Sequence, residues 1–64
     1  MDQRIMRYVP KQKREAVRDC YRDEDGYWIC LNAGWAAGPD GCRTIHEDSI
    51  RDLREAIKGI VKED

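Results

Sequence analysis

The sequence predicts an α+β fold, in which a curved, four-stranded antiparallel sheet is followed by one C-terminal helix. Three observations lead to this prediction. An acidic turn at residues 23–26 runs directly into apolar residues at 27–31, and further turn signals at 32–34 and 38–41 separate short strand-like segments. Residues 50–61 carry apolar side chains at helical spacing. The predicted order of elements is therefore ββββα.

The acidic turn predicts a β-hairpin. Asp-Gly beside alternating apolar residues is a strong hairpin signal, because Gly26 can take a positive φ at little cost. A three-residue loop at 24–26 would place Cys20 opposite Cys30. Alternation then gives one face with Val17, Tyr21, Tyr27, Ile29 and Leu31, and another with Ala16, Arg18, Cys20, Arg22, Trp28 and Cys30.

The other strands are located by the turns. We expect the first strand to begin near Glu15, although this charged segment could open a helical turn instead, and we expect short third and fourth strands at 35–37 and 42–45. Pro10 interrupts any regular element before them. The predicted organisation is a basic N-terminal arm at 1–14 and one ββββα domain at 15–64.

The helix is predicted to start at a capping box of Thr44 and Glu47, with Asp48 as a rival N-cap. It should cover the hairpin face that carries Tyr21. His46 then sits at the helix start, where a packed histidine bonded to a carbonyl is favoured over a catalytic base. The apolar stripe consists of Ile50, Leu53, Ile57, Ile60 and Val61.

One helix covers one face of the hairpin, which leaves the face with Trp28, Cys20 and Cys30 uncovered. A leftover apolar face on so short a chain indicates an interface. We therefore expect a homo-oligomer, either a dimer or a tetramer.

Charge is divided unevenly along the chain. The 64 residues carry 12 Lys and Arg and 13 Asp and Glu, a formal net charge of −1. Residues 1–22 hold seven basic and three acidic side chains, whereas residues 23–64 hold five basic and ten acidic ones. This pattern indicates a basic arm on an acidic body, or opposite halves that attract between subunits.

The sequence has no apolar run near the length of a membrane span and no signal-peptide segment, so we expect a cytoplasmic protein that contacts no membrane. The three cysteines should then be reduced thiols, although Cys20 and Cys30 could oxidise if they oppose each other. A zinc site from three Cys and His46 lacks the usual ligand spacing.

Consecutive carboxylates at the hairpin tip are candidate metal ligands. Asp23, Glu24 and Asp25 could hold Mg²⁺ or Mn²⁺ and position a water for phosphodiester attack. Neighbouring strand residues point to opposite faces, so at most two of them share an ion, and Asp23 with Asp25 is the pair we assign. The simpler interpretation is that Asp and Gly are what tight turns use.

Basic and aromatic residues form a candidate nucleic-acid surface. Arginines at a spacing of four, together with the two tryptophans, could bind phosphates and stack on bases of single strands or distorted duplex. The acidic overall balance, with a pI near 5.8, weakens this interpretation. The candidate residues are Arg14, Arg18, Arg22, Trp28 and Trp35.

Three motifs carry a resemblance to a known family: the run at 23–28, the Gly34-Trp35 pair, and residues 44–48 before the terminal helix. They resemble small proteins of prophages and mobile elements of gut Clostridia, among them an anti-CRISPR family active against type II-A effectors. The resemblance covers residues 15–62. It implies a PC4-like ββββα fold, a tetramer, and nicking of supercoiled DNA that relieves the torsion favouring R-loops.

The resemblance also implies that a carboxylate near the first hairpin acts in nicking, for which the candidates are Asp19, Asp23, Glu24 and Asp25. Three functions are thus expected. The first is an anti-CRISPR-like, DNA-acting phage protein that binds and nicks DNA with a divalent metal and opposes a host CRISPR effector. The second is a non-catalytic, PC4-like module that binds single-stranded nucleic acid. The third is an acidic inhibitor that mimics DNA and binds a basic partner protein.

Overall fold

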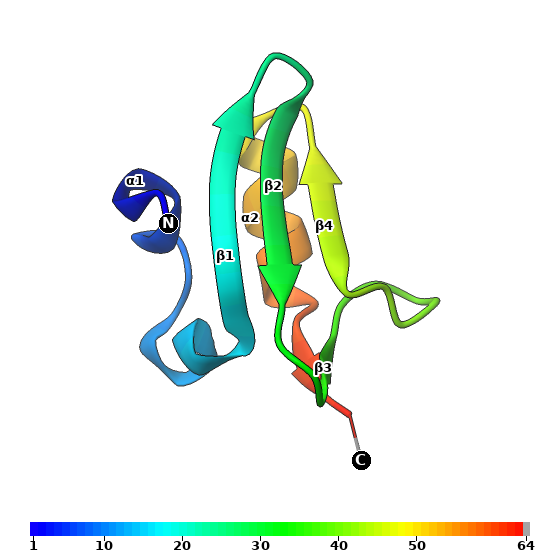
Figure 1. The fold of residues 1–64 in the computed structure, drawn as a ribbon. Coiled ribbons are helices and arrows are strands. Elements are labelled where there is room, and N and C mark those ends of the chain that lie inside the picture. Colours follow the sequence, from blue (N-terminus) through cyan, green and yellow to red (C-terminus); the bar gives the residue numbers. More distant parts are fainter. Residues whose placement is uncertain (64) are drawn as a thin grey trace.

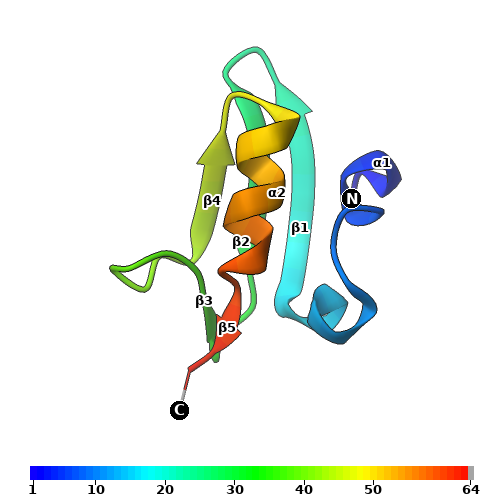
Figure 2. The same cartoon turned by 180° about the vertical axis from the view of Figure 1, so that it is seen from behind.

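The main sheet has three antiparallel strands and one covering helix. The computed structural model describes residues 1–63 and orders the strands β1-β2-β4, with β1 at Val17–Asp23, β2 at Gly26–Leu31 and β4 at Thr44–Glu47. Helix α2, at Ile50–Lys58, lies across one face, behind the sheet in Figure 1 and in front of it in Figure 2. The predicted α+β class is confirmed.

The third predicted strand belongs to a separate, two-stranded sheet, which corrects the expected four-stranded arrangement. β3, at Trp35–Ala36, pairs antiparallel with β5, at Val61–Lys62, a strand that the sequence did not predict. The N–H groups of Gly59 and Ile60 donate to the carbonyls of Ala56 and Ile57 in a turn that ends α2, and Ile60 is buried just before β5. Val61, expected on the helical stripe, lies on β5 and is 58% exposed.

The β1–β2 register differs by one residue from the prediction. Cys20 pairs with Ile29 rather than with Cys30, and Asp23 pairs with Gly26, so the loop has two residues instead of three. The Asp23 carboxylate explains the tighter turn, because its Oδ1 accepts a 2.9 Å hydrogen bond from the backbone N–H of Asp25. The slip exchanges the faces of β1 relative to β2.

The slip also separates two of the cysteines. Cys20 is buried on the face under α2, whereas Cys30 is partly buried on the opposite face of the sheet. The two thiols therefore do not oppose each other, and the predicted risk of a disulfide between them is removed.

Helix α2 begins later than predicted. Ser49 is its N-cap, since the hydroxyl accepts a 3.2 Å hydrogen bond from the N–H of Asp52, while Thr44 and Glu47 belong to β4. Leu53 and Ile57 are buried against the sheet. Full burial of such side chains stabilises the fold by about 1.5–3 kcal/mol each, which fixes the helix on this face.

The N-terminal segment packs into the same core as the sheet. Ile5, in the short helix α1 at Gln3–Met6, is 2% exposed, and Val9 is 1% exposed. The N–H of Asp2 donates to the carbonyl of Cys20 at 2.9 Å, which attaches the segment to the outer edge of β1. Residues described above as a basic arm thus contribute core side chains to the domain.

A 3₁₀ helix joins this segment to the sheet. It spans Lys11–Ala16, so β1 starts at Val17 rather than near Glu15. The alternative expectation, a helical turn in this charged segment, is confirmed. No helix in the described part of the chain is long and apolar enough to cross a membrane.

Replacing Gly26 should test the hairpin geometry. Gly26 has φ +129°, and a Cβ there would lie 2.5 Å from the carbonyl oxygen of Glu47 on β4. We expect Gly26→Ala to lower the free energy of unfolding by more than about 2 kcal/mol, measured by urea titration. Gly34→Ala is the control, because Gly34 also has a positive φ but open space around it. Equal losses in both variants would contradict the predicted clash.

Truncating Ile5 should show whether the N-terminal segment stabilises the domain. We expect Ile5→Ala to cost about 2–5 kcal/mol in thermal or urea unfolding, as for other buried aliphatic residues. Val61→Ala, at an exposed aliphatic position, should change stability by less than about 0.5 kcal/mol. An Ile5→Ala protein as stable as the Val61→Ala control would show that the segment folds apart from the core.

Candidate functional site

The sheet face opposite α2 is the candidate site, and we call it the outer face. Cys20, Ile29 and Ile45 are cross-strand partners, and all three are buried on the side of α2. Because side chains alternate along each strand, the residues next to these three point to the opposite face. Figure 1 views the molecule from this side, with no helix in front of the three strands. The side chains of the outer face are Asp19, Tyr21, Asp23, Trp28, Cys30, Thr44 and His46.

Three rings form a stacked row across the outer face, one from each strand. Trp28 pairs with Tyr21 on β1 and with His46 on β4. The Trp28 ring lies 4.0 Å from the His46 ring and 6.1 Å from the Tyr21 ring, centroid to centroid, and each pair is within 16° of parallel. At 4.0 Å the faces of Trp28 and His46 cover each other, so a further planar group can stack only on an outward ring face at an end of the row.

The indole of Trp28 is held by the hairpin turn. Its Nε1–H donates to Asp23 Oδ1 at 3.0 Å, and the same oxygen accepts the N–H of Asp25. The indole hydrogen bond is the main reason that the pKa of the Asp23 carboxyl lies below its ordinary value of 3.8. A carboxylate at this position therefore fixes both the turn and the ring orientation.

His46 is fixed from the other side of the row. Its Nε2 lies 2.7 Å from the backbone carbonyl oxygen of Asp25. A carbonyl only accepts, so Nε2 carries the proton, and Nδ1 is left facing away from this bond. The predicted bond from His46 to a backbone carbonyl is confirmed, but its predicted place at the helix start is wrong, because the residue belongs to β4 and its exposed ring stacks on Trp28.

Negative charge surrounds this row. Asp23 lies beside Trp28, Glu24 and Asp25 form the exposed hairpin loop, and Asp19 stands further along β1. The Asp19 carboxylate has a partner, the N-terminal ammonium of Met1, at 3.6 Å. The side of the row that faces the turn thus carries three carboxylates with no ion pair to any described residue.

The arginines predicted to bind phosphates do not gather on this face. Arg22 points to the α2 side, where its guanidinium carbon lies 5.2 Å from the centre of the Tyr27 ring. Arg14 donates to the carbonyl of Val9 at 3.0 Å, and exposed Arg18 lies in the β1 bulge. Trp35 packs against the core from β3. Of the predicted set, only Trp28 stands in the aromatic row.

The predicted catalytic carboxylates are divided between two places. Asp19 lies four residues from Asp23 along β1, about 13 Å at ordinary strand spacing, so it stands apart from the hairpin tip. Asp23 and Asp25 lie in one turn, but Asp23 Oδ1 already accepts two hydrogen bonds. Within residues 1–63 no three His, Cys, Asp or Glu side chains group as a metal site.

Two members of the row were missed from the sequence, Tyr21 and His46. Residues 44–47 read Thr-Ile-His-Glu, in which apolar Ile45 lies between polar neighbours, and this alternation is typical of a half-buried strand. Read as a strand beside β2, this pattern would have placed His46 next to Trp28. The outer position of Tyr21 follows only from the corrected register.

Comparisons with known proteins add no identity to this geometry. No family model matches the chain, and no curated protein or solved structure matches it. The resemblance to anti-CRISPR proteins remains a hypothesis that rests on the short motifs, and the function must be argued from the outer face itself.

The Asp23 interactions predict a pH dependence. A lowered carboxyl pKa in the folded state adds stability above pH 3.8, and this stability is lost as the pH falls through the folded-state pKa. We expect the stability advantage of the natural chain over Asp23→Asn to shrink as the pH is lowered from about 6 to about 2, in urea titrations followed by tryptophan fluorescence. Asp40→Asn, at an exposed loop position, is the control. An advantage independent of pH would contradict the role of the ionised carboxylate.

Proposed function

We propose that the outer face binds a positively charged segment of a partner protein, as in the hypothesis of an acidic inhibitor. The observation that carries this proposal is the stacked row of Tyr21, Trp28 and His46 beside the carboxylates of the hairpin turn. An arginine side chain meets both of its preferred partners there: an aromatic face for its plane and carboxylates for its N–H groups.

The chemistry of the row favours arginine over a base. Guanidinium stacked on an aromatic face contributes about 0.5–1 kcal/mol at exposed sites, and more where water is excluded. Glu24 and Asp25 are exposed in the loop that follows β1, and under this proposal they contact a guanidinium stacked on the exposed ring of Tyr21 at the β1 end of the row. Bidentate contact to a carboxylate adds direction as well as attraction.

A nucleic acid would meet repulsion on the same surface. Affinity for DNA or RNA depends on lysines and arginines that neutralise phosphates. The carboxylates of the turn beside the row carry the same negative sign as phosphates, and the arginines at 14 and 22 lie elsewhere. For this reason we rank the nucleic-acid module and the metal-dependent nicking protein below the acidic inhibitor.

The partner is defined by its chemistry as a protein with a basic surface that ordinarily receives phosphates. Carboxylates can occupy such a surface in place of a nucleic-acid backbone. The resemblance to anti-CRISPR proteins suggests a CRISPR effector as one such partner, since its nucleic-acid channel is positively charged. Under this proposal, inhibition follows from occupancy of the channel and requires no reaction.

Self-association through the outer face is disfavoured by charge. Two copies packed face to face with their hairpin turns at the same end would bring the carboxylates of both turns together, and buried like charges are costly. The oligomer expected from the sequence would then need another surface, and the outer face would stay available to a partner.

The test is binding of a fluorescently labelled arginine-rich peptide, followed by anisotropy, beside a labelled oligothymidine of similar length. We expect the peptide to bind with an affinity that falls as salt rises, and the oligonucleotide not to bind. Glu24→Gln combined with Asp25→Asn should weaken peptide binding about three- to tenfold, since exposed ion pairs contribute up to about 1 kcal/mol each. These changes leave Asp23 and the backbone bonds of the turn in place.

The control removes two carboxylates elsewhere. Glu15→Gln with Glu55→Gln makes the same change in net charge at exposed positions on the 3₁₀ helix and on α2, and should leave binding within about twofold. Equal weakening of peptide binding by both double variants would show that binding depends only on net charge, and this would contradict a site on the outer face. Binding of oligothymidine, or EDTA-sensitive nicking of supercoiled plasmid that the Glu24/Asp25 variant loses, would support the DNA-acting alternatives instead.

A further inference from the structure

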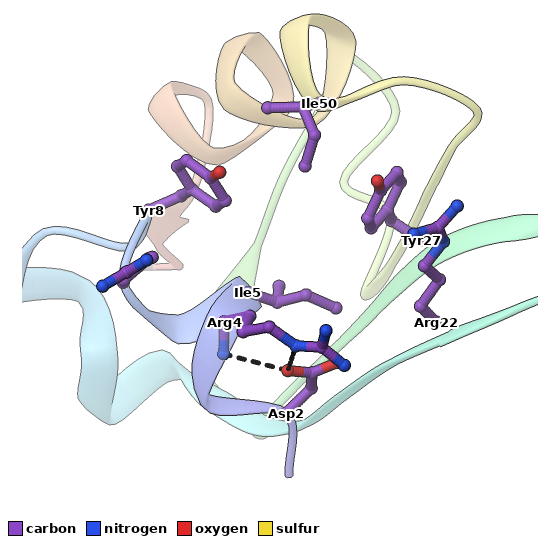
Figure 3. Close-up of a pocket in the computed structure, with 8 residues that line it drawn as sticks. Asp2, Arg4, Ile5, Tyr8, Arg22, Tyr27 and Ile50 are labelled. Carbon is purple, nitrogen blue, oxygen red and sulfur yellow. Dashed lines mark hydrogen bonds and ion pairs between the residues drawn. The ribbon is translucent and has the colours of Figure 1, made fainter.

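On the α2 side of the sheet, a cavity of about 280 Å³ lies between the N-terminal segment, the β1–β2 hairpin and the start of α2. Figure 3 shows Tyr8 and Tyr27 on opposite sides of this cavity, with Ile50 of α2 between them on one side and Ile5 across from it. Its lining thus combines two phenol rings with two aliphatic side chains. A small flat group fits between such walls better than an extended chain.

Arginines line the rest of the cavity. Arg4, Arg7 and Arg22 all contribute to its wall, against the single carboxylate of Asp2. Asp2 is already engaged, because its Oδ1 caps the N–H of Arg4 at 2.9 Å and lies 3.7 Å from the Arg4 guanidinium. The lining therefore carries an excess of two positive charges.

The guanidinium of Arg22 is held without a carboxylate. Its central carbon lies 5.2 Å from the centre of the Tyr27 ring, and within residues 1–63 neither Arg22 nor Arg7 forms an ion pair. Stacking on an aromatic face leaves the N–H groups at the edge of the guanidinium available to an oxyanion. In Figure 3 the Arg4 side chain extends toward the same side of the cavity as Arg22.

We propose that this cavity binds a small aromatic phosphate monoester, a class that includes nucleoside monophosphates. The phosphate lies against Arg22 and Arg4, and the ring lies between Tyr8 and Tyr27 over the aliphatic side chains. A phosphate monoester carries a charge of about −1.5 to −2 at pH 7, which matches the excess positive charge of the lining. A monocarboxylate supplies only about half to two thirds of that charge.

This site is independent of the proposed function. Arg22 and Tyr27 face the α2 side of the hairpin, whereas the aromatic row lies on the other side of the same strands. Changes at Arg22 leave the outer face intact, and changes at Glu24 and Asp25 leave the cavity intact. Failure of one proposal can thus be distinguished from failure of the other.

The experiment is an NMR titration of the ¹⁵N-labelled protein with phenyl phosphate, adenosine monophosphate and ribose 5-phosphate. We expect the two ring-bearing ligands to shift the amides of Tyr8, Tyr27 and Ile50 and to bind about tenfold or more tightly than ribose 5-phosphate, because stacking adds to the ionic contact. Tighter binding of adenosine monophosphate than of phenyl phosphate would narrow the class to nucleotides. The reverse order would narrow it to simple aryl phosphates.

Variants locate the phosphate contact. Arg22→Gln should weaken the binding of adenosine monophosphate about tenfold. Arg22→Lys should recover part of that loss, because lysine keeps the positive charge but lacks the paired N–H groups of the guanidinium. Arg54→Gln removes an exposed arginine from α2 outside the cavity and should leave binding within about twofold. Equal losses in Arg22→Gln and Arg54→Gln, equal binding of ribose 5-phosphate, or shifts centred on Tyr21 and His46 would overturn the proposal.

Discussion

The turn at residues 23–26 is the constraint on which the rest of the structure depends. The Asp23 carboxylate accepts the N–H of Asp25 and the indole N–H of Trp28, and Gly26 supplies the positive φ at a point where β4 leaves no room for a side chain. Together they fix the register of β1 on β2. Because a slip of one residue exchanges the two faces of a strand, this turn decides which β1 side chains meet α2 and which form the outer face.

Two surfaces of opposite character result from that register. Tyr21 and Arg22 are neighbours in sequence, yet the first stacks in the aromatic row and the second lines the basic cavity. The uneven charge along the chain becomes a division in space, since the arginines at positions 4 and 7 fold against the α2 side of the sheet. The acidic turn stands at one end of the outer face, where those arginines do not neutralise it.

The sequence was sufficient for the hairpin and the final helix, but not for α1, β5 or the pairing of the strands. The hairpin, the final helix and an uncovered face with Trp28 and Cys30 were all predicted, because turn residues and apolar spacing are local signals. The register was missed by one residue, since it depends on which groups bond the Asp23 carboxylate. His46 was misplaced because Thr44 and Glu47 have the spacing of a capping box, whereas the N-cap of α2 in the structure is Ser49. Ile5 and Val9 were separated from the core since burial of a short segment depends on distant partners.

The attachment of Asp2 to Cys20 has a consequence for how the chain behaves at high concentration. β1 is an edge strand, and an edge strand presents unpaired backbone groups that can recruit a strand from another molecule. Here the N–H of Asp2 bonds the Cys20 carbonyl, the Cys20 thiol bonds the Asp2 carbonyl, and the N-terminal segment lies along that edge. The first residues of the chain thus act as a cover against edge-to-edge aggregation. Affinity tags or fusions placed directly before Met1 would disturb this cover, whereas β5 pairs with β3 and lies apart from the edge of β1.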